Sequence, residues 1–452
     1  MKHYIIAFIT TSFLFASCKL VNVTDVSPVN QLEDANGITS VEKAQSALYG
    51  TYGILNGNTL AFNYYMPAAA SLMGLTMDPV QDGFGYANNN PATNHYWLEN
   101  MYAGGYKMIN MSNHIISKTT ALGGDDPRKK RIIGEAKYLR AMSYFYLLRL
   151  FGEFYDTTSN YGLVLRLDPV KDAEVFPRSG VRATYDVINK DLDEAILETS
   201  DFTSTFYASK IAARALKSKV LLYQQRYAEA AAMAKQVTTS GQRNLEDTFK
   251  TVFSKKIRDT REVIFQTPFD AGTNINNKCY AFNAWFTPSA YYINFMKGDA
   301  RESMAIRVTG TRIRNGKFIA GQVDGAPSNS DTEYFIRLAE IYLVQAEAIV
   351  RSGGSLAEAR QALNIIRKRA LMPDITLDDK AGLLNAIREE KIRELGAESG
   401  EEWYDLVRYA SKGELDIKTF KPDFMGKQRY ILPIPLNSIQ ASGKIVEQNP
   451  GF

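Results

Sequence analysis

Apolar residues recur at three- and four-residue steps through most of this chain, and this periodicity favours a fold built mainly from helices. One such stripe runs through Ile132, Ala136, Leu139, Ser143, Tyr146 and Leu150. The same spacing predicts helices at 41–55, 97–120, 127–151, 181–198, 208–224, 227–239, 333–351, 355–371 and 380–396. Before the first of them, Thr39 and Ser40 offer the short side-chain oxygen that suits a helix N-cap.

Two of the predicted helix pairs resemble each other. Tyr227-Ala-Glu-Ala follows one helix and Leu356-Ala-Glu-Ala follows another, so that Ala228, Glu229 and Ala230 match Ala357, Glu358 and Ala359 at a constant offset. Small residues at these positions let two helices approach closely across a short turn. This is the pattern of tetratricopeptide repeats, whose helix pairs stack to bury a shared core. Two unrelated Ala-rich hairpins are the alternative.

Two stretches interrupt the helical pattern. Residues 60–96 and 241–332 are rich in Gly, Asn, Pro, Asp and aromatic residues, and we expect them to be irregular excursions. Within them and beside them, Glu262–Gln266 and Arg314–Ile319 alternate in the manner of short strands. Long loops on a rigid frame are usually functional, so these excursions are where a binding site is expected.

The first residues read as an export signal. Lys2 and His3 precede an apolar run that ends at Ala16-Ser17-Cys18, and this run is too short to span a bilayer. A Cys after two small residues resembles the bacterial lipobox, although Phe15 stands where Leu is usual. We therefore expect residues 1–17 to be removed and Cys18 to be lipidated; an ordinary signal with an incidental Cys is the alternative. Cys279 would then have no partner, and we expect it to be buried and inert.

Composition argues against several functions. The chain has 53 basic and 49 acidic residues among 452, a balance too even to indicate nucleic-acid binding. Of its three histidines only His95 and His114 follow the signal, and no Gly-x-Ser-x-Gly, His-Glu-x-x-His or Cys-x-x-Cys motif is present. We therefore expect no catalytic residue, no metal site and no cofactor. Gly310–Lys317 resembles a P-loop, but its glycine spacing and Phe318 do not fit one. A glycosidase needs only two carboxylates and stays an open alternative.

Aromatic residues are plentiful, with 26 Tyr, 23 Phe and 3 Trp. Aromatic rings suit the apolar C–H face of a sugar, and neighbouring carboxylates and amides suit its hydroxyls. Two loops combine these groups, at 78–97 and 280–292, and we expect them to meet in one exposed platform. The candidate ligand-binding residues are Asp78, Asp82, Phe84, Tyr86, Tyr280, Trp285, Phe286 and Tyr291. For Asp78 and Asp82, capping of turns is the alternative, and for Trp97 it is core packing.

Ordered blocks of sequence resemble the SusD/RagB family of lipoproteins. They are the run Gly134–Gly152 (GEAKYLRAMSYFYLLRLFG), Ile336–Leu343 leading into Ala346-Glu347-Ala348, Leu363–Ala370, Trp403–Arg408 (WYDLVR), Leu432–Pro435 (LPIP) and Gln448–Phe452 (QNPGF). Together they cover nearly the whole chain in the family's order. Tyr404 is an insertion relative to the family's W-D-L-x-R box, and 241–332 is short for its region.

The resemblance implies a mainly α fold, in which a tetratricopeptide-like superhelix packs against a loop-rich half. It implies one unit over 18–452, with a helical frame at about 38–240 and 333–410 and a C-terminal segment at 411–452. It also implies a lipid-anchored outer-membrane protein that faces the cell exterior and is the lid of a SusC-like TonB-dependent transporter. Such proteins capture oligosaccharides, or in some cases peptides, and are not enzymes. A scaffold that uses the repeats as a peptide groove is a further alternative.

Overall fold

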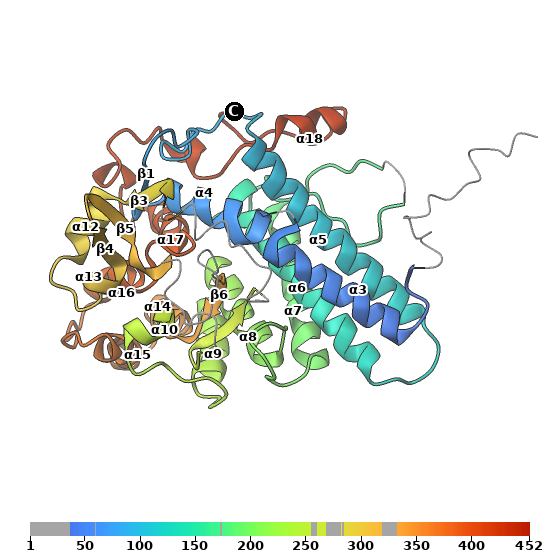
Figure 1. Cartoon of the computed structure of the whole chain (residues 1–452), viewed down its shortest axis with the longest axis horizontal. Helices are drawn as coiled ribbons and strands as arrows, with labels where there is room; N and C mark the ends of the chain where they lie inside the picture. Colours follow the sequence, from blue (N-terminus) through green and yellow to red (C-terminus); the bar gives the residue numbers. More distant parts are fainter. Residues whose placement is uncertain are drawn as a thin grey trace, which may run out of the picture.

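The computed structural model describes residues 37–58, 60–171, 174–254, 260–267, 282, 284–318 and 332–452. The predicted signal, Cys18 and Cys279 lie outside these ranges. The described chain is a frame of long helices that carries three short two-stranded sheets (Figure 1).

Four long helices form the first part of the frame: α3 (Val41–Gly53), α5 (Tyr96–Ala121), α6 (Arg128–Phe151) and α7 (Val181–Glu198). Ser40 caps α3, because its hydroxyl accepts a hydrogen bond from the Lys43 amide at 3.3 Å. α6 packs against both α5 and α7 (Figure 1). Its predicted stripe is buried, and so is every residue from Tyr138 to Phe151. The second half of α6 is therefore enclosed on all sides.

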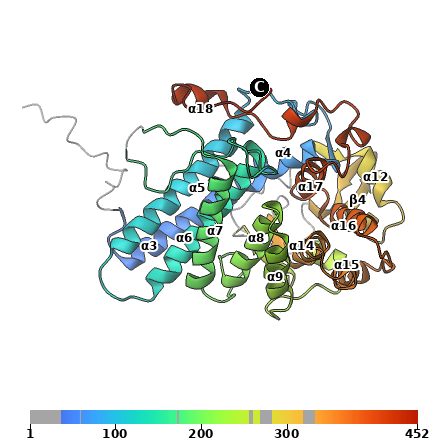
Figure 2. The same cartoon turned by 180° about the vertical axis from the view of Figure 1, so that it is seen from behind.

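Five further helices stack in chain order: α8 (Lys210–Tyr223), α9 (Tyr227–Thr238), α14 (Leu338–Arg351), α15 (Leu356–Arg369) and α16 (Lys380–Leu395). α8 packs against α7 and α9, α9 against α14, and α14 against both α15 and α16 (Figure 2). Ala230 and Ala359, two of the small residues that match between the copies, are fully buried. The α8–α9 and α14–α15 pairs are thus neighbouring hairpins of one helical stack, as the repeat predicts.

The predicted helix at 333–351 begins later than expected. Its first residues form strand β6 (Tyr334–Arg337), which pairs antiparallel with β2 (Val263–Gln266). The four residues of β6 are all buried, so they have no apolar-polar alternation that would distinguish a strand from a helix. The expected strand at Glu262–Gln266 is confirmed by β2.

The excursion at 60–96 is also less irregular than expected. Residues Ala61–Tyr65 form a π-helical turn that continues into helix α4 (Met66–Met73). Every residue of α4 is buried. A short helix that is apolar on all sides shows no stripe, and for this reason the periodicity did not reveal it.

Two more antiparallel sheets complete the loop-rich half. β1 (Met77–Pro79) pairs with β3 (Phe286–Pro288), and β4 (Ile306–Thr309) pairs with β5 (Arg312–Asn315). The strand expected at Arg314–Ile319 is therefore mostly wrong, because a 3-10 turn, Gly316–Phe318, follows β5. Any side chain at Gly316 would place a Cβ 2.0 Å from the carbonyl oxygen of Met304.

Short helices link these parts. They are α10 (Phe249–Ser254), α12 (Ala290–Met296), α13 (Glu302–Ala305), α17 (Glu401–Ala410) and α18 (Leu436–Ala441), with 3-10 turns η6 (Ile417–Thr419) and η7 (Lys427–Arg429). None of the helices in the described ranges is long and apolar enough to cross a membrane.

Ten buried charged residues join the loop-rich half to the helical stack, and we call them the ion-pair core. They are Glu262, Asp299, Arg301, Lys317, Arg337, Arg367, Arg369, Glu390, Glu394 and Glu398, five acidic and five basic. At its centre the Arg337 guanidinium lies 2.7 Å from Glu262, 2.9 Å from Glu394 and 2.8 Å from Glu398. Buried charges are tolerated only when they are paired, and here each carboxylate faces at least one cation.

The end of the chain is held against the end of α6. Asn449 donates hydrogen bonds from Nδ2 to the carbonyl oxygens of Phe151 and Leu432, at 3.0 and 2.6 Å, and its Oδ1 accepts one from Arg178 at 2.7 Å. Gln448 bonds both the amide and the carbonyl of Ile434. The polar residues of the terminal block thus bond backbone groups of Phe151, Leu432 and Ile434, which fixes the end of the chain against α6.

Candidate functional site: an aromatic platform

The β1–β3 sheet brings the two predicted aromatic loops together. Asp78 lies opposite Thr287 and Pro79 opposite Phe286 in the antiparallel register. The amide of Val80 donates a further hydrogen bond to the carbonyl of Trp285 at 2.9 Å. The chain segments that follow β1 and precede β3 therefore leave the sheet side by side.

The loop after β1 is a series of tight turns. The Asp82 carboxylate accepts a hydrogen bond from the Phe84 amide at 2.8 Å, as an Asx turn requires. Phe84 and Gly85 both have positive φ, 50° and 80°. A Cβ at Gly85 would lie 2.5 Å from the Asn90 carbonyl oxygen, so the turn needs glycine there. This backbone turns the ring of Phe84 outward.

A cavity of about 910 Å³ lies over these loops. Four parts of the chain line it: the π-helical turn before α4, the loop after β1 with the start of α5, strand β3 with the two residues before it, and the β4–β5 hairpin. The lining residues are Tyr64, Pro79, Val80, Gln81, Asp82, Phe84, Tyr96, Trp97, Ala284, Trp285, Phe286, Thr287, Thr311, Arg312 and Ile313. We call this lined surface the aromatic platform.

Several large apolar side chains are exposed together on the platform. The exposed fraction is 42% for Phe84, 53% for Tyr96 and 52% for Trp285, and Val80 is exposed beside them. Folded proteins seldom leave contiguous apolar surface in water without a binding role. The platform thus has the apolar faces that a sugar ring or an apolar side chain would cover.

A packed aromatic cluster supports the exposed rings. Trp97, which is 1% exposed, lies at its centre. Its ring centroid is 5.2 Å from Tyr86 in a stacked arrangement, 5.5 Å from Tyr64 and 5.8 Å from Phe84. The ring of His95 stacks on Phe84 at 4.9 Å. Because these rings are fixed from below, the exposed ones are held in place before any ligand arrives.

Two buried polar atoms on the cavity wall lack a hydrogen-bond partner within the described structure: the Tyr64 hydroxyl and Nε1 of Trp97. Burial raises the pKa of Tyr64 well above its ordinary value, so it is a neutral hydroxyl at physiological pH. Unsatisfied buried donors cost free energy, which a ligand hydroxyl could recover.

The platform has few charges. Burial lowers the pKa of His95, and the nearby Asp82 carboxylate only partly opposes this effect. His95 is therefore neutral at pH 7. With Asp82 acting as a turn cap and Arg312 at the hairpin, the surface offers one carboxylate and one guanidinium among mostly uncharged groups. Among the residues described, no three His, Cys, Asp or Glu side chains are placed to share a metal ion.

The structure separates the eight predicted ligand residues into groups. Asp82, Phe84, Trp285 and Phe286 line the cavity, although Phe286 is buried. Tyr86 is fully buried beneath it, with its hydroxyl 3.4 Å from Nδ1 of His95. Tyr280 lies outside the described residues.

The other two of the eight point elsewhere. Asp78 lies on β1 but does not line the cavity. Burial raises the pKa of its carboxyl, while Lys421 and the amide of Ala290 act in the opposite direction. Tyr291 lies on α12, where it stacks on Phe295 at 5.6 Å, away from the platform.

Several lining residues were not among the candidates. Tyr64 lies in the segment at 60–96 that was expected to be irregular, and three consecutive bulky residues, Tyr64-Tyr65-Met66, were its only local signal. Thr311 and Arg312 lie in a stretch that resembled a P-loop. Gly310, at φ 61°, is the turn residue of the β4–β5 hairpin instead.

Comparisons with known proteins match SusD-type proteins in both the N-terminal and the C-terminal part of the chain. The model of the SusD family matches residues 289–452, and a model described as "Starch-binding associating with outer membrane" matches residues 32–222. A SusD-like protein of Bacteroides ovatus is 23% identical over 90% of this chain and 83% of its own.

Solved structures share the fold. A SusD superfamily protein from Bacteroides vulgatus superposes with a TM-score of 0.79 at 23% identity, over 92% of this chain and 100% of the other. A laminarin binding SusD-like protein superposes with a TM-score of 0.75 at 22% identity, over 92% and 100%. The mainly helical SusD-like fold implied by the sequence blocks is thereby confirmed.

Proposed function

We propose that this chain is a non-catalytic binding protein of the SusD/RagB family and that it captures an oligosaccharide on the aromatic platform. The observation that carries the proposal is the set of exposed rings, Phe84, Tyr96 and Trp285, around one cavity of about 910 Å³. A cavity of this size accommodates a ligand of several sugar rings.

The chemistry of the platform fits a neutral glycan. Its exposed rings cover the C–H faces of sugars, and the unpaired donors of Tyr64 and Trp97 suit hydroxyl oxygens. Gln81, Thr287 and Thr311 add uncharged polar groups along the wall. The laminarin-binding relative with the same fold supports a glycan as the ligand class.

We further propose that the protein works at the outer membrane. Removal of residues 1–17 and lipidation of Cys18 would tether it there, facing the cell exterior, as the lid of a SusC-like TonB-dependent transporter. The name of the family model that matches residues 32–222 supports an outer-membrane location. Co-purification of a transporter with the wild-type chain, and its loss for Cys18→Ala, would test the anchor and the partner together.

Titration of the mature protein with a panel of oligosaccharides, followed by Trp fluorescence and calorimetry, tests the ligand. Wild type is expected to bind at least one glycan. Trp285→Ala, Tyr96→Ala and Phe84→Ala are each expected to weaken binding about tenfold, as the loss of one ring contact would.

Tyr49→Ala is the matched control, because Tyr49 is an exposed aromatic residue on α3, outside the platform lining. It should bind like wild type. Unchanged binding in all three platform variants would refute the platform as the site. A peptide library run in parallel distinguishes the peptide-binding alternative, since peptide binding without glycan binding would exclude a glycan ligand.

A further inference from the structure

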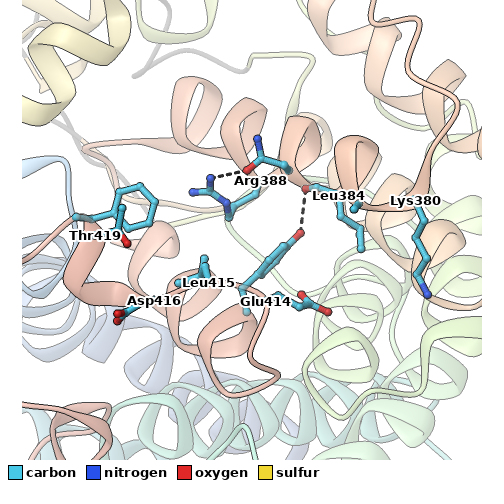
Figure 3. Close-up of a pocket in the computed structure, with 11 residues that line it drawn as sticks. Lys380, Leu384, Arg388, Glu414, Leu415, Asp416 and Thr419 are labelled. Carbon is cyan, nitrogen blue, oxygen red and sulfur yellow. Dashed lines mark hydrogen bonds between the residues drawn. The ribbon is translucent and has the colours of Figure 1, made fainter.

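A second cavity, of about 530 Å³, lies between α16 and the segment that runs from the end of α17 to η6 (Figure 3). Its lining shares no residue with the aromatic platform. One face of α16 forms one wall, and the other wall consists of Tyr409, the 414–416 linker and the end of η6. The lining residues are Lys380, Ala381, Leu384, Asn385, Arg388, Tyr409, Glu414, Leu415, Asp416, Thr419 and Phe420.

The walls of this cavity are largely apolar. Leu384 and Leu415 contribute aliphatic surface, and Tyr409 and Phe420 contribute rings. The hydroxyl of Tyr409 is already engaged, because it donates to the Leu384 carbonyl at 3.2 Å. The walls therefore offer few free polar groups of the kind that the hydroxyls of a sugar would require.

One buried cation lines the cavity and has a side-chain nitrogen without a hydrogen-bond partner in the described structure. Arg388 is 7% exposed and lies under the Phe420 ring, 5.4 Å from its centroid. Its Nη2 donates to Asn385 at 2.7 Å, while its Nη1 has no hydrogen-bond partner among the described residues. Tyr291 is a neighbour from α12: burial raises the pKa of its hydroxyl, with Glu389 adding to the rise, while the charges of Arg388 and Arg393 and a hydrogen bond with Arg388 lower it. Figure 3 shows Arg388 in the middle of the cavity wall, between Lys380 and Thr419.

The acidic residues on the opposite wall already have partners. Both oxygens of Glu414 accept hydrogen bonds from Arg351, each at 2.8 Å. Asp416 accepts the Lys418 amide at 2.9 Å as the cap of η6. At the mouth, Lys380 adds a second positive charge. With Glu414 neutralised by Arg351, the lining leaves an excess of one positive charge, carried inside by Arg388.

We propose that this cavity binds a monocarboxylate with an apolar body, and that it is a ligand site separate from the aromatic platform. The carboxylate would accept a hydrogen bond from Nη1 of Arg388, and the apolar body would lie between Leu384, Leu415 and Phe420. An excess of one positive charge matches a monoanion better than a phosphate dianion. Apolar walls match an alkyl or aryl body better than a sugar.

The probe is 4-phenylbutyrate, titrated into the purified mature protein and followed by calorimetry and ligand-observed NMR. Two analogues separate the contributions: 4-phenylbutanol keeps the body without the charge, and acetate keeps the charge without the body. We expect 4-phenylbutyrate to bind at least tenfold more tightly than either. Hydrogen phosphate, the dianion, and the platform's glycan ligand should not compete.

Two variants locate the site. Arg388→Gln removes the charge and is expected to weaken 4-phenylbutyrate at least tenfold. Ala381→Trp places a ring at the exposed mouth without touching the core, and is expected to block entry in a protein that folds normally. Arg360→Gln, an arginine on α15 outside the lining, is the matched control and should bind like wild type.

Equal affinity for 4-phenylbutyrate and 4-phenylbutanol would overturn the proposal, as would binding that survives both Arg388→Gln and Ala381→Trp. Failure of all three probes to bind the folded wild type would also overturn it. None of these outcomes depends on the platform, because glycan binding is measured separately on the same preparations.

Discussion

The aromatic platform lies in the loop-rich half of the molecule and the ion-pair core lies where that half meets the helical stack, and the two differ in what they expose to water. The platform leaves the rings of Phe84, Tyr96 and Trp285 exposed to water. A ligand that covers them removes this apolar surface from water and gains free energy. The ion-pair core takes ten charges out of water and pairs each of them with at least one opposite charge. The comparison indicates that binding and stability reside in different residues, so each can be changed without the other.

The largest effect is expected at the centre of the ion-pair core. Arg337→Ala leaves Glu262, Glu394 and Glu398 short of a cation in a buried site, and breaking such a network costs about 3–5 kcal/mol. Urea unfolding followed by circular dichroism measures the loss. Arg182→Ala, at an exposed arginine on α7, should change the free energy of unfolding by less than about 0.5 kcal/mol. A loss below about 1 kcal/mol for Arg337→Ala would contradict this account of the core.

The next effect concerns Glu402 on α17, whose Oε1 accepts a hydrogen bond from the Thr76 hydroxyl, just before β1. Burial raises the pKa of Glu402 to about 7, despite the opposing hydrogen bond from Thr76 and the charge of Lys317, while Glu401 raises it further. The folded state favours the protonated form of Glu402. This preference contributes fully to the free energy of unfolding below the unfolded pKa of about 4.5, and the contribution is lost as the pH rises through 7. The difference between the folded and unfolded pKa values of Glu402 corresponds to about 3 kcal/mol in the free energy of unfolding.

Wild type should therefore lose stability relative to Glu402→Gln between pH 5 and pH 7.5, in paired unfolding curves. Burial lowers the pKa of Lys421 to about 8. Because Lys421 is present in both proteins, most of its effect cancels in the difference between their free energies of unfolding. Parallel pH profiles for the two proteins would show that Glu402 does not titrate in this range.

On the platform we expect a smaller effect, and one on glycan binding rather than on stability. Trp285→Ala should weaken glycan binding about tenfold, or about 1.4 kcal/mol, and change the free energy of unfolding by less than about 0.5 kcal/mol. Its ring is 52% exposed, so its removal opens no cavity in the core. Loss of stability comparable to that of Arg337→Ala would mean that the platform also supports the fold.

The smallest effect is expected for Tyr64→Phe, which removes a buried hydroxyl that has no partner in the described structure. Stability should stay the same or rise by up to about 1 kcal/mol, because an unsatisfied polar group is lost. Glycan affinity should fall about threefold if the hydroxyl donates to the ligand. Calorimetry of this variant beside Trp285→Ala separates hydrogen bonding from ring contact, and unchanged affinity would remove Tyr64 from the site.

Most long helices could be predicted from the sequence, because a helix that keeps one face exposed, such as α5 or α7, repeats its apolar residues at helical spacing. The stripe of α6 starts in its partly exposed first half, before the segment that is enclosed on all sides. α7 coincides with its predicted range, 181–198, and α6 begins within one residue of its own. Short elements buried on every side were missed or misplaced, as α4 and β6 show, since an apolar run of four to eight residues carries no period. Loop convergence was predicted from composition alone, and the β1–β3 pairing bears it out.

The sequence by itself determined the helical frame, the repeated hairpins and the family resemblance, because these depend on local periodicity and on ordered blocks of residues. Only the tertiary structure decided what each side chain meets. Phe84 and Tyr86 stand two residues apart, yet the positive-φ turn at 84–85 leaves one ring 42% exposed and the other fully buried against Trp97. Likewise Arg337 is buried among three carboxylates, while Arg388 lines a cavity. The two arginines differ because segments distant in the sequence supply the neighbours of each one.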